Sequence, residues 1–580
     1  MAPTREVDPP GVDVYTRAMV SRPPAGRGVV VALAVAVCVA ATSRTASAPT
    51  SVPAPAAIRV APGSTPDPAE PAVTPHVLDA PQPSPPEPGS DRAAVDPGPA
   101  LGPIDSGLSG WTAALLPEAT RDLRALADAP RYSITLAISS DRRVVTGSQE
   151  TRYVNREAEP LRELVLRMFP STVNMGSNMR LSRVAVNGEI APTLPITLNS
   201  PSDLAPIVDT AAVSVPLAAA LMPGAALTLT VAYTIHVTDN PSAGYRAFGR
   251  VNGVLAIPGA YAAIPARRDG FWLMSAAPNY GDVVLAEAAW FRVEIESDED
   301  LTLVAPGMCS GGPGSAAGRQ RVTCVAGPIR EFAVTAGRFN QVNASIRLSG
   351  GDVAVESYAT SGRLRGAALA ARMAADALAA YEKRFGAYPY RVLKVYESPT
   401  TVGGMEYSML AGVTDSLYDA PEAPYFEWIV AHEVAHQWWY GLVGSDPVNE
   451  PWLDEGLTNY AITFYFEDVY GASYALANRN SDYYGRYAAA LKNYPDQPAG
   501  LPTGQYPPGA YGPFVYGKAP IFFDTVRRAS GDEAFLRWIR LYAARNRFGI
   551  AQAADLLAAA DETGVGISAR AAWRQWVAAR

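Results

Sequence analysis

Two short stretches of the sequence hold residues with metal-ligand chemistry. His432 and His436 enclose Glu433 in an H-E-x-x-H element, and Glu455 follows 19 residues after the second histidine. Histidines four apart fall on one face of a helix, so both imidazoles can reach one cation. Two neutral imidazoles suit Zn²⁺, which takes a third protein ligand and keeps one position open for water. We therefore predict that His432, His436 and Glu455 bind one zinc ion per chain, beside Glu433 as the base that takes a proton from the attacking water.

The alternative to a metal site is a pair of helix histidines that are satisfied by hydrogen bonds. The whole chain contains 4 histidines, and half of them belong to this element. The other two are isolated: His76 lies in a proline-rich stretch, and His236 falls on the polar face of a predicted strand. This concentration favours the metal site.

The sequence around the cluster predicts the elements that position it. We expect helices over about 426–440 and 452–470, and the second can return antiparallel to the first and present Glu455 to the same ion. Upstream, the sequence predicts an Ala-rich helix, two short strands and a loop with the sequence V-G-G-M-E-Y: 364–385, 392–395, 409–413 and 402–407.

The middle of the chain predicts a β scaffold. Apolar residues alternate with polar ones over 132–138, 227–237 and 291–295. A period of two indicates half-buried antiparallel strands, and their number favours a sandwich. We predict a multidomain α+β protein, in which an antiparallel β-sandwich-like domain over 111–342 precedes an α/β-plus-helical catalytic domain over 343–580.

The N-terminal segment predicts export. An unbroken apolar run over 29–41 follows two arginines and precedes the small-x-small site Ala46-Ser47-Ala48. This is the layout of a secretory signal, and the run is shorter than a usual bilayer span. We expect a signal peptide or signal anchor over 1–48 and a disordered Pro/Ala-rich linker over 49–110. The rest would then be extracytoplasmic, either secreted or anchored at the outer face of a bacterial cytoplasmic membrane.

Composition narrows the classes of partner. The 580 residues are 48% hydrophobic and 18% charged, which is too apolar for a disordered protein. A net charge of −8 disfavours a nucleic-acid-binding protein. The sequence therefore predicts no nucleic-acid partner, and membrane contact only through the N-terminal anchor.

Two cysteines predict a disulfide. Cys309 and Cys324 flank a Gly-rich turn between two strand-like runs. Opposing positions of such a hairpin can be bridged in an oxidising compartment. Two buried free thiols are the alternative.

Three motifs resemble one known family. H-E-V-A-H-Q-W-W-Y-G-L-V-G followed by W-L-D-E-G is similar to the zinc signature of the aminopeptidase N type of zinc metallopeptidases, within the gluzincins. G-G-M-E-Y resembles that family's exopeptidase motif. V-Y-G-K-A-P places Tyr516 61 residues after Glu455, where the family keeps a catalytic tyrosine. The resemblance covers roughly residues 130–575 and implies a thermolysin-like catalytic domain.

The resemblance implies a role for each matching residue. Tyr516 would donate a hydrogen bond to the oxyanion of the tetrahedral intermediate, and Glu406 would anchor the free α-ammonium group of a peptide. Gly403 and Gly404, which lack side chains, would let the substrate backbone approach. The implied activity is that of an exported zinc aminopeptidase acting on peptides.

The sequence departs from the family pattern at two positions. Tyr407 and Asp454 stand where the family usually has asparagine, and no glutamine or glutamate segment for a second amine contact is recognisable in the β domain. An endopeptidase or an epoxide-type hydrolase is therefore an alternative, and an inactive envelope-binding protein is a weaker one. Asp454, Glu450 and Lys518 are candidates to support the ligands.

Overall fold

The computed structural model describes residue 104 and residues 107–172, 177–200, 207–240, 244–245, 248–276, 278 and 280–578. The predicted signal segment 1–48 and nearly all of the predicted linker 49–110 lie outside these residues. No helix within the described ranges combines the length and the apolar character that crossing a bilayer requires.

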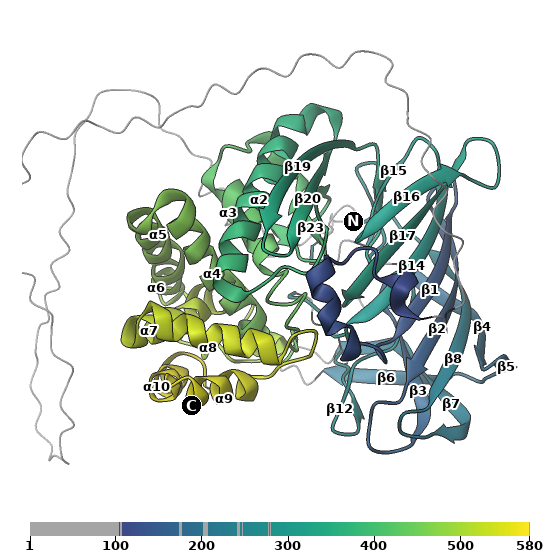
Figure 1. Cartoon of the computed structure of the whole chain (residues 1–580), viewed down its shortest axis with the longest axis horizontal. Coiled ribbons are helices and arrows are strands. Elements are labelled where there is room, and N and C mark those ends of the chain that lie inside the picture. Colours follow the sequence, from purple (N-terminus) through teal and green to yellow (C-terminus); the bar gives the residue numbers. More distant parts are fainter. Residues whose placement is uncertain are drawn as a thin grey trace, which may run out of the picture. The chain divides into compact units, whose positions relative to one another are not determined.

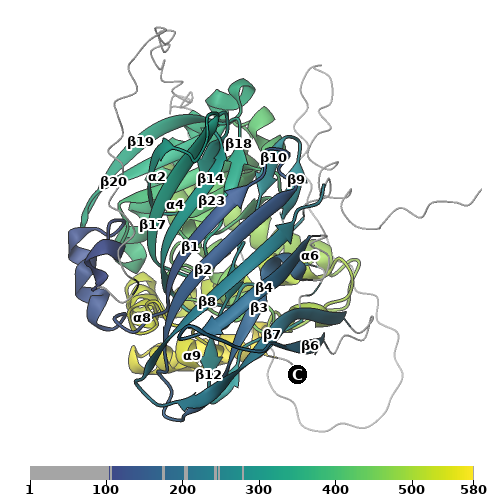
Figure 2. The same cartoon turned by 90° about the vertical axis from the view of Figure 1, so that its right-hand side faces the viewer.

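Among the described residues, the largest sheet has eight strands (Figures 1 and 2). In their order across the sheet they are β16 (Met308–Pro313), β17 (Arg319–Ile329), β14 (Ala289–Asp298), β1 (Arg131–Ile138), β2 (Val144–Val154), β8 (Ala226–His236), β4 (Asn178–Val186) and β5 (Glu189–Ile190). The alternating segments predicted over 132–138, 227–237 and 291–295 are β1, β8 and β14. Neighbouring strands are antiparallel except for β1 and β14, which pair in parallel.

Smaller sheets complete this half of the chain. One holds β11 (Ala262–Ala263), β3 (Leu161–Met168), β7 (Ile207–Leu221) and β6 (Leu194–Ser200). Another holds β15 (Thr302–Val304), β18 (Thr335–Gly337), β10 (Val254–Ala256) and β9 (Gly249–Val251), and β12 (Arg267–Arg268) pairs with β13 (Phe271–Trp272). Apolar residues of β1, β3, β7 and β8 belong to one buried cluster, so the alternation seen in the sequence serves a shared core.

The predicted disulfide lies at the edge of the eight-stranded sheet. Cys309 of β16 and Cys324 of β17 are directly opposite each other, with their Cα atoms 4.0 Å apart, and a disulfide joins them. Lys394, which is buried, donates to the carbonyl of Ala305 (2.8 Å) just before β16. This hydrogen bond connects the disulfide hairpin to the sheet of the C-terminal half.

A mixed sheet and a layer of helices form the C-terminal half (Figure 1). The strands are β19 (Asn340–Leu348), β20 (Gly351–Ala359), β21 (Val392–Ser398), β23 (Leu410–Thr414) and β22 (Gly404–Met405). The helices are α2 (Leu364–Phe385), α3 (Pro424–Ala435), α4 (Pro451–Tyr470), α5 (Ala472–Arg479), α6 (Arg486–Ala490), α7 (Ala519–Ser530), α8 (Asp532–Arg545), α9 (Ala553–Glu562) and α10 (Gly566–Trp576). The predicted boundary between residues 342 and 343 falls inside β19.

Helix α3 ends earlier than the sequence predicts. The expected helix runs to about residue 440, whereas α3 ends at Ala435 with His436 as its C-cap. Beyond it the backbone N–H groups of Gly441 and Leu442 bond five residues back, to His436 and Gln437, and Tyr440 has a φ of 146°. A helix cannot continue through that backbone conformation, so the chain turns directly after the second histidine.

A buried arginine fixes this turn to the β half. The guanidinium of Arg330 donates to the backbone carbonyl oxygens of Tyr440, Leu442 (3.2 Å), Gly549 (2.6 Å) and Ala286 (3.1 Å). One side chain therefore binds backbone acceptors from three separate loops, and two of these acceptors, the carbonyl oxygens of Leu442 and Gly549, also accept from the backbone N–H groups of Phe548 and Gly444. The turn after α3 is held in place from outside its own sequence.

Glu331 adds a second tie between the two halves. Its carboxylate accepts hydrogen bonds from the Ser408 backbone N–H (2.9 Å) and from the Tyr440 hydroxyl. Burial raises the pKa of Glu331 from 4.5 to about 7, although these bonds and Arg330 favour the ionised form. The cost of removing this carboxylate from water is therefore larger than the stabilisation that its partners provide.

This raised pKa predicts a pH dependence of stability. Between about pH 4.5 and 7 the folded chain holds the Glu331 proton more tightly than the unfolded chain, so the free energy of unfolding falls as pH rises through this window. Glu331→Gln should remove this pH dependence, which amounts to about 3 kcal/mol of unfolding free energy over the whole window. Urea unfolding of both proteins, followed by tryptophan fluorescence at several pH values, measures the difference. Parallel stability curves for the two proteins would contradict the prediction.

Candidate metal and catalytic site

Two helices bring the predicted ligands together. His432 and His436 lie on the last turn of α3, and Glu455 lies on the first turns of α4. The Nε2 atoms of the two histidines are 3.0 Å apart, and Glu455 Oε2 lies 3.3 and 3.4 Å from them. All three side chains are at least 95% buried. The predicted antiparallel return of the second helix is thus what the structure contains.

The donor atoms of this triad fit a bound cation. Glu455 Oε2 is buried and has no hydrogen-bond partner in the described part of the chain, and both imidazole Nε2 atoms point at the same place. Burying a carboxylate oxygen without a partner is costly unless a cation completes it. Two nitrogen donors and one carboxylate form a ligand set typical of catalytic Zn²⁺.

The electrostatics keep Glu455 ready to bind a cation. Burial alone would raise its pKa, but the close approach of His432 and His436 holds the pKa of Glu455 well below its usual value. For His432 burial is the largest effect, and it lowers the pKa of the imidazole. An ionised carboxylate and a neutral imidazole are the protonation states that metal ligation requires. Burial lowers the pKa of His436, but the carboxylates of Asp454 and Glu455 outweigh it and raise that pKa well above its usual value, so a bound cation has to displace a proton there.

A carboxylate behind the metal site orients His436. Its Nδ1 lies 2.9 Å from Asp454 Oδ1, 3.0 Å from the Trp439 carbonyl oxygen and 3.1 Å from Thr458 Oγ1. Acceptors on this side hold the proton on Nδ1 and leave the Nε2 lone pair facing the ligand position. Asp454 therefore supports a ligand, as the sequence suggests.

The other two candidates for this role lie elsewhere. Lys518 pairs with Asp496 (2.6 Å), and Glu450 accepts from the backbone N–H of Ala553 (3.3 Å). Neither contacts a predicted ligand in these hydrogen bonds.

Glu433 lies next to the triad and beneath a glycine. Burial raises the pKa of Glu433 to about 8, although the nearby His436 acts to lower it. The Oε2 atom of Glu433 has no hydrogen-bond partner among the described residues. A Cβ at position 404 would lie 2.1 Å from Glu433 Oε1, so any other residue there would collide with this carboxylate. Gly404 is thus needed for the packing of the base, apart from the substrate contact predicted for it.

Gly403 has a similar structural reason. Its φ is +106°, a conformation that favours glycine, and a Cβ there would lie 2.8 Å from Ile429 on α3. The glycine pair lets strand β22 pass close over the helix that carries the histidines.

Two acidic side chains lie together at a small cavity beside the metal site. The cavity is lined by Glu406 and also by Asp282, which comes from the β half just before β14. Burial raises the pKa of Glu406 well above its usual value, and Asp282 and Glu433 add to the effect. Burial likewise raises the pKa of Asp282, with the charge of Glu455 as the next cause. A cationic ligand would relieve this repulsion.

Sequence reasoning missed Asp282. It lies in a loop between β13 and β14, without a motif and more than 100 residues before Glu406. The sequence held one indirect hint. A glutamine or glutamate segment for a second amine contact was expected in the β half, and none was recognisable there.

Tyr516 also reaches the site. It lies on a short π-helical segment, Pro513–Lys518, and its hydroxyl donates to Glu455 Oε1. The Asn459 amide donates to its backbone carbonyl (2.7 Å), which fixes the segment to α4. Burial, and then the charge of Glu455, raise the pKa of Tyr516 well above its usual value, so the phenol remains a hydrogen-bond donor.

The exopeptidase-like loop is fastened to the end of α3. The Gln437 side chain accepts from the backbone N–H of Met409 (2.7 Å) and donates to the carbonyl of Tyr407 (3.2 Å). The Tyr407 side chain is buried between two cavities. Trp438, beside Gln437, is a packing residue whose indole N–H donates to the Gly386 carbonyl (2.9 Å).

Comparison with known proteins places this site in a family. Residues 370–576 match the model of the peptidase family M1 domain. This segment contains the triad, Glu433, Glu406 and Tyr516. Residues 370–576 are a peptidase family M1 domain.

Part of the chain is similar in sequence to two aminopeptidases. Aminopeptidase B of Rattus norvegicus is 28% identical over 192 residues, which are 31% of this chain and 29% of that protein. Aminopeptidase RNPEPL1 of Homo sapiens is 27% identical over 190 residues, 31% of this chain and 26% of that protein. The chain thus spans less than a third of the length of either relative.

The fold extends beyond the M1 domain. The M1 zinc metallopeptidase of Deinococcus radiodurans matches with a TM-score of 0.56 at 19% identity, over 78% of this chain and 94% of that one. A mutant of that metallopeptidase, bound to a Tyr-Ser-Ala substrate, matches with a TM-score of 0.56 at 18% identity, over 78% and 94%. The β half and the M1 domain together therefore have the fold of M1 zinc metallopeptidase structures.

The contact between Asp454 and His436 predicts an effect on metal affinity. Asp454→Asn keeps the shape of the side chain but removes the charge that orients the imidazole, so the affinity for Zn²⁺ should fall about 10- to 100-fold. Competition with a chromogenic chelator measures this affinity. Asp468→Asn is the matched control, because Asp468 lies on the same helix and pairs with Lys383 and Arg384 instead. Equal affinities in wild type and Asp454→Asn would show that this contact does not support the ligand.

Proposed function

We propose that the protein is an exported zinc aminopeptidase that hydrolyses the first peptide bond of unblocked peptides. The observation that carries this proposal is the arrangement of two groups side by side. One is the His432, His436 and Glu455 triad with Glu433 next to it, and the other is the acidic pair at the adjoining cavity. The first group suits hydrolysis by activated water, and the second suits a positively charged chain end.

The triad, Glu433 and Tyr516 have separate roles in this hydrolysis. Zinc bound by the triad supplies Lewis-acid polarisation of the scissile carbonyl and lowers the pKa of the attacking water. Glu433 accepts the proton of that water and delivers it to the leaving amine, and its raised pKa suits both steps. Tyr516 leaves Glu455 and donates to the oxyanion of the tetrahedral intermediate, a contact worth about 3 to 4 kcal/mol in comparable sites.

Glu406 and Asp282 determine which bond is cleaved. An α-ammonium group between these two carboxyls gains two charge-assisted hydrogen bonds, whereas an acetylated amine leaves both carboxyls without a cation. The triad next to this pair then faces the first peptide bond. Peptides with a free N-terminus are therefore the substrates, and cleavage proceeds from that end.

The test compares free and acetylated forms of one peptide. The zinc-loaded protein should release the first residue of the free peptide and leave the acetylated peptide intact. Glu406→Gln should lower kcat/KM for the free peptide about 10- to 100-fold and narrow the difference between the two forms. Mass spectrometry of the products gives rates and cleavage positions.

Two further variants complete this experiment. Glu433→Gln should abolish turnover of the free peptide while the protein still binds zinc, and Glu422→Gln is the control, since Glu422 is exposed and pairs with Arg365. Equal internal cleavage of free and acetylated peptides would instead indicate an endopeptidase.

Export is supported by two independent features. The N-terminal sequence has the layout of a secretory signal, and the described residues contain the Cys309–Cys324 disulfide, a bond that persists in oxidising compartments. The protein then works on the outer side of a bacterial cytoplasmic membrane, secreted or held by its N-terminal segment.

Fractionation of producing bacterial cells tests export. The full chain should appear outside the cytoplasm, in the medium or with the membrane fraction, and a variant without residues 29–41 should stay in the cytoplasm. Release of the full chain only with the cytoplasmic contents would refute this part of the proposal.

A further inference from the structure

Strand β19 leaves one end of the C-terminal sheet open. In the sheet order β19-β20-β21-β23-β22 its neighbour is β20, and in Figure 2 these two strands lie at the outer margin of this half of the chain. No hydrogen bond from any other segment within the described ranges reaches the β19 backbone. Because every second residue of an edge strand directs its N–H and C=O groups outward, β19 presents a row of free backbone groups to a further strand.

The other sheet ends of the described chain are protected, whereas β19 is not. Strands β5, β11, β12, β13 and β22 have two residues each, and β9 and β15 have three. β6 and β16 are longer, but they contain Pro195 and Pro313, which lack the N–H group that further pairing needs. β19 has nine residues without a proline, and its register with β20 is continuous from Asn340 to Leu348. Short length, proline and bulges, which usually protect an open edge, are therefore missing from β19.

The two faces of β19 already suit an extension of the sheet. Its half-buried apolar side chains, which pack against the core, are Val342, Ala344 and Ile346. Its exposed polar side chains are Gln341, Asn343, Ser345 and Arg347. Arg347 is the one charged residue of the strand and pairs with Asp352 of β20 (2.9 Å). A strand beside β19 would bury the rest of the three apolar side chains, and the stabilisation grows with the apolar area removed from water.

We propose that β19 is a docking surface for a second copy of this chain, and that the two β19 strands pair antiparallel about Ala344. A contact between identical surfaces requires a surface that fits itself. Pairing about Ala344 overlaps all nine residues, so it is the longest register that the strand offers to its own copy. The facing side chains, each pair formed twice, are then Val342 and Ile346, Asn343 and Ser345, and Gln341 and Arg347. In these pairs apolar side chains face apolar ones and no like charges face each other.

The start of α2 adds an apolar side chain to this interface. The Asn340 amide donates to the Ser361 hydroxyl (3.0 Å), so the start of α2 lies at this end of β19. Leu364, the first residue of α2, is 40% exposed. The two-fold axis of the pair is perpendicular to the sheet, so the Asn340 end meets the Leu348 end of the second copy and both α2 helices lie on the same face. Leu364 therefore lies where the second copy can bury it.

The first test compares two double variants of the zinc-loaded full chain by sedimentation equilibrium. Asn343→Lys with Ser345→Lys places lysines opposite each other in the pair, whereas Asn343→Lys with Ser345→Glu places opposite charges there. Both variants share the change at position 343, which faces Glu356 of β20. We expect the wild type to form dimers with a Kd of about 10 µM or below. The Kd should rise about 10-fold or more in the first variant and stay within about threefold of the wild type in the second.

The second test measures the register by disulfide crosslinking, in chains that all carry Cys38→Ser. Ala344→Cys faces its own copy, with Cβ atoms about 5 Å apart, so mild oxidation should link the two chains. Val342→Cys is the matched control, because it faces Ile346 and lies about 14 Å from its own copy, a distance that a disulfide cannot span. Non-reducing gel electrophoresis measures the linked fraction.

The variants also carry their own control for folding. β19 and β22 are the opposite ends of the sheet, and β22 is the strand next to the metal site, so zinc affinity should be the same in every variant. A wild type that stays monomeric at about 100 µM overturns the proposal, and so do equal dissociation constants for the two double variants. Failure of Ala344→Cys to crosslink, or equal crosslinking of Val342→Cys, overturns the pairing about Ala344.

Discussion

Mutual repulsion among buried carboxyl groups is the constraint on which this site depends. Four buried ones, Glu406, Glu433, Asp454 and Glu455, and the half-buried Asp282 influence one another's charge around the end of α3, against two imidazoles. Such a cluster is costly to bury unless cations share it. A divalent ion on the triad and, in the proposed function, an ammonium group at the acidic pair would supply the missing charge. The same crowding that raises several of these pKa values is thus consistent with the proposed binding of a metal and a charged chain end at neighbouring positions.

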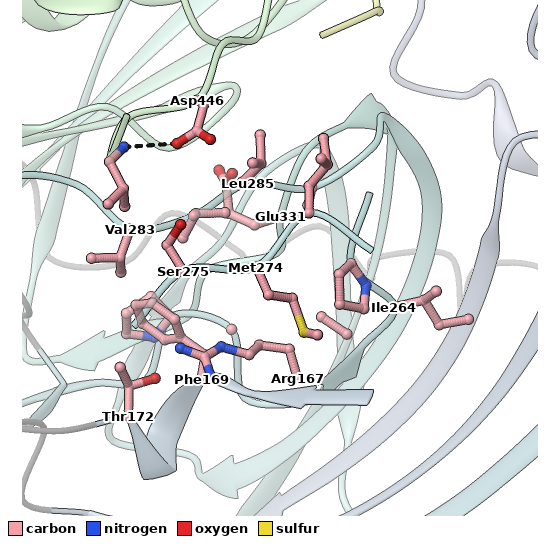
Figure 3. Close-up of a pocket in the computed structure, with 18 of the residues that line it drawn as sticks. Arg167, Phe169, Thr172, Ile264, Met274, Ser275, Val283, Leu285, Glu331 and Asp446 are labelled. Atoms are coloured by element: carbon pink, nitrogen blue, oxygen red, sulfur yellow. Dashed lines mark hydrogen bonds between the residues drawn. The ribbon is translucent and has the colours of Figure 1, made fainter. Parts of the chain in front are cut away.

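The geometry of this cluster is set from several directions at once. Helix α3 carries the histidines on its final turn, and the chain leaves it immediately, so His436 is both a predicted ligand and the helix cap. Arg330 fixes the departing backbone from the β half by binding its carbonyl oxygens. Asp282 enters from the same half. Because these contacts come from the β half, that half is a structural part of the site. It also supplies most of the lining of the second cavity beside Tyr407 (Figure 3).

Much of this was predictable from short-range patterns. The spacing of His432, His436 and Glu455 identified the triad, because residues four apart share a helix face and the next helix has one antiparallel return available. Alternating polarity predicted β1 and β8 to within one residue and the central half of β14, since a strand with one buried face repeats every two residues. The hairpin cysteines were placed opposite each other by the same local logic. The parallel pairing of β1 with β14 was outside that logic, because more than 100 residues separate the two strands.

The sequence by itself determined which residues could bind a metal, which helices and strands carry or flank them, and that an acidic residue lies in the loop before the triad. Only the tertiary structure decided where α3 ends, that Glu433 occupies the space that a side chain at position 404 would need, and that Asp282 joins Glu406. The physical reason is the range of the forces involved. Periodicity and capping act within a few residues and are visible in the sequence, whereas burial, repulsion between carboxyls and the shape of a cavity depend on segments that meet only after the chain has packed.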